Sequence, residues 1–482
     1  VITGGIRNDS NFDYQLHEMD QLKLVAGFTK AAFKINNHEE VIETIYKAYD
    51  IATSGEPGPV FIELPVNLQI DKATIADLPT YSASTQPALS ANVVKQIKHA
   101  AQMLMQANNP AIFAGWGAMR ASNTLIEISE QIGGAVATTM QGISAFPANH
   151  PLHAGFCFGP AAAPAAQNAF DNADCVIAIG TRFGEIATGS FGGQLPENLI
   201  HIDINPDVFD VNFKTAISIE GDSEQVCQQL LLELQRIGAA KDGGQVAKQI
   251  AADKKAYRES WYQHDSKDRV NPALYFDELR SQLSDDAHIV VDDGNHTFLT
   301  VELMPIHQAY GFISPTDFNC MGYATPAAIA VKMAKPNREV HAIVGDGAFM
   351  MTATELATAV AQNLGLVIGV FNDGELSQIA QAQQIPYSRK TCTVLPQTKL
   401  KGLAMATGAE YVRIENNNEI KSGLTKARAL AQENKAVILD INIDYSKATA
   451  FTEGAVKTNL KRMPLPTKVR MVGRALVRKV TG

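Results

Sequence analysis

The sequence predicts an α/β protein built from doubly wound domains with parallel sheets. Short apolar runs alternate with segments of helical periodicity, roughly 10–15 residues long, as is typical of βαβ units. Several of the runs end in a glycine-containing turn, and open α/β sheets bind ligands at the strand ends where such turns lie. With 482 residues, the chain is long enough for about three domains.

The first segment predicts only part of such a domain. Residues 1–70 contain a helical pattern at 39–52 and, after a Gly-Pro turn, an apolar run at 60–64 that predicts a buried strand. We interpret 1–70 as about half of a domain, because it is shorter than a complete one. Residues 71–90 contain Ser, Thr and Pro without clear periodicity, so we expect a linker there.

The next two segments each predict a complete doubly wound domain. The central, Rossmann-like domain is expected at 91–240, with apolar runs at 111–114, 175–179 and 199–204. The third domain is expected at 268–450, with apolar runs at 289–291, 340–344, 366–371 and 436–443. Three runs of the third domain lead into turns that combine Asp or Asn with Gly, which makes this domain the expected ligand-binding one.

Composition excludes several classes of protein. The net charge of −9 argues against a general nucleic-acid binder, because affinity for phosphate backbones comes from clustered Lys and Arg. Five scattered cysteines form no CxxC pair, which favours reduced thiols in a cytoplasmic protein. No apolar run approaches the ~18–20 residues of a membrane-spanning helix.

The strongest motif combines two of these glycine turns. The first places Asp346 between Gly345 and Gly347 after a strand, and the next strand is expected to return Asn372 to the same sheet edge. Carboxylate and amide oxygens suit Mg²⁺, while the glycines and a helix start favour a diphosphate. A helix capping box at Thr352 predicts a helix that runs to about residue 363. Taken alone, the motif also fits an ordinary surface turn.

Further motifs match one family in their order along the chain. Asn372 follows the Gly-Asp-Gly turn after 24 residues, Gly-Asn-His lies at 294–296, and Met321 lies in Cys-Met-Gly-Tyr-Ala-Thr-Pro-Ala-Ala at 320–328. Other matching segments lie at 2–4, 17–18, 55–65, 138–142, 180–183 and 201–205. With these motifs the chain resembles the thiamine-diphosphate (ThDP)-dependent enzymes, and within them the acetolactate synthase large subunit. The resemblance identifies 1–70 as the end of the pyrimidine-binding domain and 268–450 as the diphosphate- and Mg²⁺-binding domain.

This resemblance implies a set of site residues. Mg²⁺ would be bound by Asp346, the side chain of Asn372 and the main-chain carbonyl of Gly374. Met321 would hold the two cofactor rings in a bent conformation, and it is predicted as catalytic together with His17. The predicted cofactor-binding residues are Asn295, His296, Met321, Gly345, Asp346, Gly347, Ala348 and Asn372.

The resemblance also implies an activity and an assembly. We expect decarboxylation of a pyruvate-like 2-keto acid, followed by carboligation to a second carbonyl, in a homodimer or homotetramer with the active site between subunits. A ThDP-dependent decarboxylase or oxidase is the alternative enzyme. A cofactor-binding pseudoenzyme or regulatory subunit is the alternative that is not an enzyme.

The sequence departs from the family pattern at several positions. The family's activating Glu is not found, and Glu18 does not occupy its place; we expect that Glu in an N-terminal segment preceding Val1 rather than a pseudoenzyme. His17 stands where the family usually has Gln, and Asp373 replaces a second Asn. Ala382 stands where true acetolactate synthases carry a Trp that shapes the acceptor pocket, so the acceptor substrate stays open.

FAD in the central domain is a further cofactor that the resemblance raises. The turns at 115–117, 155–159 and 180–183, with Asp203, lie where relatives bind that nucleotide. Glycines after strands are common in every doubly wound domain, and many relatives have an empty central domain. We therefore keep FAD as an alternative and do not favour it.

The C-terminal tail, 451–482, is basic. After Glu453 it contains eight Lys and Arg residues and no Asp or Glu, and its helical spacing aligns the apolar residues Val469, Val472, Leu476 and Val480. Such a helix could lie on an anionic membrane surface. We favour the other interpretation, in which it docks on an acidic neighbouring subunit.

Overall fold

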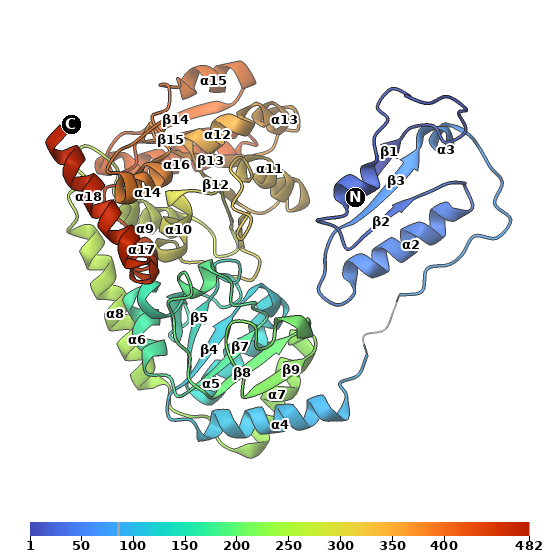
Figure 1. The fold of residues 1–482 in the computed structure, drawn as a ribbon. Helices are drawn as coiled ribbons and strands as arrows, with labels where there is room; N and C mark the ends of the chain where they lie inside the picture. Colours follow the sequence, from blue (N-terminus) through green and yellow to red (C-terminus); the bar gives the residue numbers. More distant parts are fainter. Residues whose placement is uncertain (84–86, 482) are drawn as a thin grey trace. The chain divides into compact units, whose positions relative to one another are not determined.

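The computed structural model describes residues 1–83 and 87–481, which form two compact units, Val1–Ser90 and Ala91–Gly482 (Figure 1). The first unit has a parallel three-stranded sheet in the order β1-β3-β2. Its strands are β1 (Ile2–Gly5), β2 (Ala31–Lys34) and β3 (Val60–Pro65), and its helices are α1 (Gln21–Val25), α2 (Glu40–Thr53) and α3 (Val66–Ile70).

A small core holds the first unit together. The central strand β3 is almost wholly buried, and α2 covers the sheet with Ala48, which packs with Ile35, Val60 and Ile62. The described part of 71–90 forms no helix or strand, and the remaining residues of that predicted linker, 84–86, lie outside the described residues.

The second unit contains two parallel six-stranded sheets. The first sheet has the order β6-β5-β4-β7-β8-β9, which reverses direction at β4 as in a doubly wound domain. Its strands are β4 (Pro110–Ala114), β5 (Ala135–Thr138), β6 (His153–Phe156), β7 (Cys175–Ile179), β8 (Leu199–Asp203) and β9 (Ile217–Glu220). Its helices are α4 (Ala91–Gln106), α5 (Ser122–Ile132), α6 (Pro164–Asp171) and α7 (Ser223–Ile237), and α8 (Gly244–Tyr262) connects it to the next sheet.

The second sheet of this unit has the order β11-β10-β12-β13-β15-β14. Its strands are β10 (His288–Val291), β11 (Phe312–Ile313), β12 (Val340–Gly345), β13 (Leu366–Phe371), β14 (Glu410–Ile414) and β15 (Ala436–Ile441). Its helices are α9 (Pro272–Gln282), α10 (Asn295–Leu303), α11 (Ala324–Ala334), α12 (Asp346–Thr352), α13 (Leu356–Ala361), α14 (Ser377–Tyr387), α15 (Leu400–Thr407) and α16 (Ile420–Gln432). Short 3₁₀ helices lie at η1 (Trp116–Ala121), η2 (Gly159–Ala161), η3 (Ile186–Thr188), η4 (Pro206–Val208), η5 (Ala353–Glu355) and η6 (Asn417–Glu419).

All three sheets are parallel, so the predicted fold class is confirmed. The inner strands are continuous apolar runs because helices cover both faces: every residue of β4, β7, β13 and β15 is buried. The helix expected around Thr352 was predicted wrongly. It already begins at Asp346, is interrupted by the 3₁₀ turn η5, and leaves the hydroxyl of Thr352 without a partner in place of a capping box.

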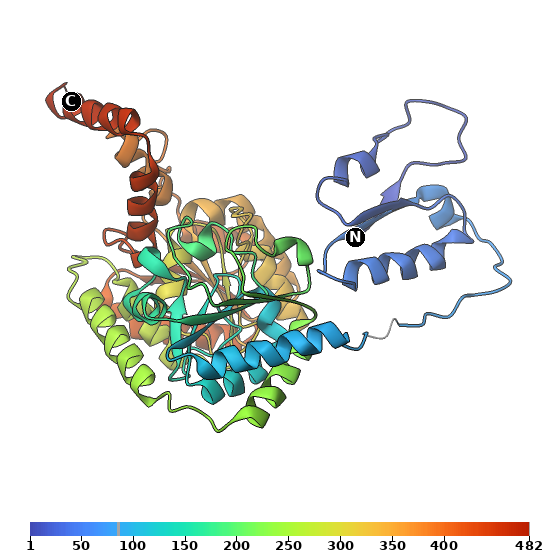
Figure 2. The same ribbon diagram turned by 60° about the horizontal axis from the view of Figure 1, so that its bottom comes forward.

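Two helices form the C-terminal tail, α17 (Ala450–Arg462) and α18 (Leu465–Thr481), and Figure 2 shows them leading away from the sheets of the second unit. One face of α18 packs on α14. The apolar residues Val469, Val472 and Leu476 lie on another face and are exposed, whereas the side chain of Val480 lies outside the described residues. Among the described helices, none is both long and apolar enough to cross a membrane.

Candidate active site

Two glycine turns meet at the carboxyl edge of the third sheet along the chain, which is formed by strands β10 to β15. Asp346 follows β12 directly, and its carboxylate accepts hydrogen bonds from the backbone N–H of Gly347 at 2.8 Å and of Gly374 at 2.9 Å. Because β12 and β13 are paired up to their last residues, Asn372 emerges beside Asp346. The structure therefore brings together the three residues expected to bind the metal.

Electrostatics at this edge favour a bound cation. Asp346 is 9% exposed, and its burial, together with the nearby charge of Asp373, raises its pKa to about 6. Burial also raises the pKa of Asp373, whose carboxylate accepts a hydrogen bond from the Ser377 hydroxyl. A divalent cation at this position would offset both the burial and the repulsion between the two carboxylates.

The ligand atoms suit magnesium in kind and number. The described part of the chain contains no cluster of three or more His, Cys, Asp or Glu side chains that could hold a metal, so carboxylates alone do not form a site here. Asp346 with the amide oxygen of Asn372 and the carbonyl of Gly374 would give three oxygen ligands. Mg²⁺ usually takes few protein ligands and completes its shell with water and phosphate oxygens, so these residues fit the ion.

His296 lies behind the turn at Gly345. A Cβ atom added to Gly345 would lie 3.1 Å from Cε1 of His296, so the imidazole supports the backbone at the point where β12 ends. The side chain is buried, and this burial lowers its pKa to about 3, so the ring is neutral. Its Nε2 is buried and has no hydrogen-bond partner among the described residues, while Nδ1 and Cε1 face the turn.

Asn295 connects the start of α10 to α14. Its side-chain amide donates to the side-chain oxygen of Gln381 at 3.2 Å, and Gln381 in turn donates to the carbonyl of Tyr445 at 3.2 Å. The Tyr445 hydroxyl is buried and unpaired within the described chain. The predicted cofactor residue Asn295 thus belongs to a polar chain between helices in this structure.

Met321 is held in place by a buried carboxylate that the sequence analysis did not select. Asp292, fully buried at the end of β10, accepts the backbone N–H of Gly322 at 2.9 Å and of Ala324 at 2.7 Å. Gly322 has a φ of +87°, a conformation that favours glycine, so the turn carrying Met321 has a defined geometry. A strand-end carboxylate before a glycine turn was the sequence signal that could have identified Asp292.

Gly347 occupies a cradle with no room for a side chain. A Cβ atom there would lie 2.7 Å from Cδ2 of Leu376 and 3.6 Å from the terminal methyl of Met321. Ala348 follows it and is buried. The structure therefore places Met321 beside the predicted diphosphate turn, where a cofactor can approach the backbone closely.

His17 is the predicted site residue that belongs to the first unit. It is exposed and has a φ of +67°, and Glu18 beside it accepts the backbone N–H of Gln15 at 2.8 Å. Because His17 belongs to a different compact unit from the third sheet, its catalytic role stays a prediction.

The glycines of the central domain are explained by packing. A Cβ atom on Gly115 would lie 2.1 Å from the carbonyl oxygen of Gly180, and one on Gly117 would lie 2.8 Å from its Cα. Asp203 accepts the backbone N–H of Asn205 at 2.9 Å and closes its own turn. Packing thus accounts for Gly115 and Gly117, and FAD stays an alternative for the central domain.

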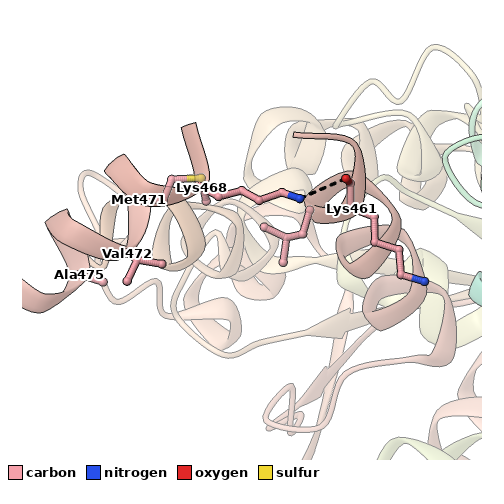
Figure 3. A pocket seen from close by; sticks show the side chains of 6 residues that line it. Lys461, Lys468, Met471, Val472 and Ala475 are labelled. Atoms are coloured by element: carbon pink, nitrogen blue, oxygen red, sulfur yellow. Dashed lines mark hydrogen bonds between the residues drawn. The ribbon is translucent and has the colours of Figure 1, made fainter. Parts of the chain in front are cut away.

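A cavity of about 490 Å³ lies apart from these residues, between α17 and α18 (Figure 3). It is lined by Leu460, Lys461, Lys468, Met471, Val472 and Ala475. The ammonium group of Lys468 donates to the carbonyl of Lys461 at 3.2 Å across it. None of the residues predicted to bind the cofactor or the metal lines this cavity, so it is not the candidate active site.

Comparison with known proteins identifies the family. The thiamine pyrophosphate enzyme central domain matches residues 97–230, and the C-terminal thiamine pyrophosphate binding domain matches 292–441. A probable acetolactate synthase large subunit of Methanocaldococcus jannaschii is 32% identical over 471 residues, which cover 93% of this chain and 77% of that protein. The chain belongs to the acetolactate synthase large subunit family of thiamine pyrophosphate enzymes.

Other members of the acetolactate synthase family also match most of the chain. The Escherichia coli isozyme 3 large subunit is 28% identical over 89% of this chain and 76% of its own length, and the Corynebacterium glutamicum large subunit is 26% identical over 91% and 71%. Membership confirms the predicted family and the prediction of a ThDP-dependent enzyme. All predicted cofactor and metal residues from Asn295 to Gly374 lie inside the matched thiamine pyrophosphate binding domain.

Proposed function

We propose that this enzyme binds ThDP through Mg²⁺ at the carboxyl edge of the third sheet and decarboxylates a pyruvate-like 2-keto acid, with carboligation to a second carbonyl. The observation that carries the proposal is the convergence of Asp346, Asn372 and Gly374, within a matched thiamine pyrophosphate binding domain. The names of the relatives, which are acetolactate synthases, support the carboligation step.

Each of the proposed site residues would have a separate role. Asp346, Asn372 and Gly374 would hold the ion, and the ion would anchor the diphosphate. Gly347 would let the turn keep its backbone conformation beside that group, because a Cβ atom there would lie 2.7 Å from Cδ2 of Leu376. ThDP, when bound, supplies an electron-accepting ring for decarboxylation. Met321 would orient the cofactor, and orientation of reacting groups contributes several kcal/mol to catalysis, roughly up to 7–11.

The acceptor carbonyl is the less defined part of the proposal. Ala382 lies exposed on α14, close in sequence to Gln381, which is linked to Asn295. A small side chain there favours a wide acceptor pocket, so we propose a 2-keto acid or an aldehyde as acceptor. A decarboxylase would use the same ThDP site and release an aldehyde. An oxidase would use it and form hydrogen peroxide.

We further propose a homodimer or homotetramer as the working form. The exposed apolar residues Val469, Val472 and Leu476 of α18 and its basic side chains support docking of this helix on an acidic surface of a neighbouring subunit. FAD is not part of the proposal.

Calorimetric titration of ThDP into the metal-stripped full chain, with and without Mg²⁺, tests the cofactor site. We expect Mg²⁺-dependent binding that is lost in Asp346→Ala. The matched control is Glu355→Ala, which removes an exposed carboxylate from the same segment and is expected to bind ThDP normally. Equal binding by both variants would contradict the site.

Product analysis with pyruvate alone tests the reaction. We expect a 2-hydroxy ketone product from carboligation. Acetaldehyde without a ligated product would assign the decarboxylase alternative, and hydrogen peroxide formation would assign the oxidase.

A further inference from the structure

Asn372 lies between two strands that each contribute a carboxylate. β13, which it follows, is paired with β12 on one side and with β15 on the other. Asp346 follows β12, and Asp440 is the penultimate residue of β15. Asp440 is paired with Val370, two residues before Asn372, and the side chain of Asn372 reaches Asp440 across this pair of strands.

Asp440 is a buried acceptor with three donors. It is 5% exposed, and its Oδ1 accepts from the side-chain Nδ2 of Asn372 at 3.1 Å and from Arg413 at 2.5 Å. Its Oδ2 accepts from the Tyr411 hydroxyl at 2.8 Å. Arg413 contributes an opposite charge, which it shares with Glu415 through a second contact of 2.6 Å.

A carboxylate in this position determines the orientation of the amide. An ionised Asp can only accept hydrogen bonds, whereas an Asn side chain has one donor nitrogen and one acceptor oxygen. The nitrogen of Asn372 must therefore face Asp440. Because the two atoms lie on opposite sides of the amide carbon, the oxygen faces away from β15, on the side of the sheet where Asp346 lies.

We propose that Asp440 is a positioning residue for the metal site: its hydrogen bond to Nδ2 of Asn372 presents the amide oxygen of Asn372 to a divalent cation shared with Asp346. This inference rests on the proposed function, in which Asn372 is a metal ligand. Residues that orient metal ligands in this way commonly change metal affinity by about 10–100-fold when they are replaced.

Titration of Mg²⁺ into the metal-stripped full chain at saturating ThDP tests the inference. Asp440→Ala removes the acceptor of the Asn372 amide and so allows both of its orientations; we expect Mg²⁺ affinity to fall about tenfold. Tyr411→Phe is the matched control, since it removes another hydrogen bond of Asp440 and leaves the one to Asn372. We expect it to bind Mg²⁺ within about twofold of the unchanged protein, well below the effect of replacing the orienting residue.

A double variant separates orientation from structural damage. Asn372→Asp combined with Asp440→Ala leaves the total charge of the pair unchanged. A carboxylate at position 372 presents an oxygen in either orientation, so we expect Mg²⁺ affinity to be restored relative to Asp440→Ala. Because its total charge equals that of the unchanged protein, the double variant also serves as the test if Asp440→Ala alone does not fold.

The outcomes distinguish the inference from the function it rests on. At excess Mg²⁺, ThDP affinity of Asp440→Ala is expected to return to normal. Unchanged Mg²⁺ affinity in Asp440→Ala, or a loss that neither excess Mg²⁺ nor the double variant corrects, would overturn the positioning role. If Asn372→Ala also left Mg²⁺ affinity unchanged, the proposed metal site itself would be wrong.

Discussion

Glu302 of α10 forms hydrogen bonds that connect the start of α17 to the domain of the third sheet. Its carboxylate accepts the backbone N–H of Ala450 at 3.1 Å and of Phe451 at 2.8 Å, at the start of α17, and also the hydroxyl of Tyr257. Burial raises the pKa of Glu302 from 4.5 to about 7. Between pH 4.5 and about pH 7, the folded protein therefore keeps a proton on Glu302 that the unfolded chain has released.

The sign and size of the pH effect follow from this difference. Stability from this group is fully present below the unfolded pKa of 4.5 and is lost as the pH rises through the folded pKa of about 7. A change of one in pKa corresponds to about 1.4 kcal/mol, so the rise from 4.5 to about 7 gives an effect of at most about 3.5 kcal/mol, or about 300-fold in a local opening constant. We take this as an upper limit, because the side chain is only partly buried.

Hydrogen exchange of residues 450–462 between pH 5 and pH 8 measures this effect. After correction for intrinsic exchange, protection of the unchanged protein is expected to fall as the pH rises, whereas Glu302→Gln, which cannot ionise, is expected to show no such decrease. Tyr257→Phe removes a hydrogen bond that lowers the pKa of Glu302, so its decrease should move to higher pH. The same pH dependence in the unchanged protein and in Glu302→Gln would refute this reasoning.

Three further substitutions test the packing of the site and of the central domain. Asp292→Ala leaves two buried N–H groups unpaired and is expected to cost about 3 kcal/mol in urea unfolding, with a smaller loss for Asp292→Asn. Gly347→Ala places a methyl group 2.7 Å from a flexible end of Leu376, which predicts a loss of about 1–3 kcal/mol in thermal unfolding and weaker ThDP binding by calorimetry. Gly115→Ala meets a backbone carbonyl at 2.1 Å and is expected to yield little soluble protein, whereas Gly27→Ala, with no atom within 4 Å, serves as the tolerated control in the same expression test.

The sequence predicted the parts of the site that lie in recognisable turns. Asp346 and Asn372 could be predicted because each follows an apolar strand and lies one or two residues before a glycine. Asp292 has the same signal, since it follows β10 and lies two residues before Gly294, but its partner Gly322 lies thirty residues later in the chain and approaches it only in the folded state. Asp440 could not be predicted, because it lies inside an apolar run and its role depends on which strand pairs beside it.

The sequence pattern also did not predict where the helix at the site begins. Thr352 and Glu355 have the spacing of a capping box, but the turn at Asp346 starts the helix earlier, since its carboxylate is tied to Gly347 and Gly374. Local propensity thus favoured a later start, and the tertiary contact between the two glycine turns determined the actual one.

The strand order of the third sheet also determines when the site can form during folding. β13 lies between β12 and β15 in the sheet, yet β15 begins 65 residues after the end of β13. β14, which comes before β15 in the chain, pairs with the other edge of β15. Contacts between such distant segments form slowly, because closing long loops costs chain entropy before any pairing compensates it. Asn372 and Asp440 therefore meet late, and a nascent chain that has completed β13 still lacks the arrangement of the metal site. Added Mg²⁺ and ThDP should accordingly stabilise the finished domain without accelerating its early folding steps.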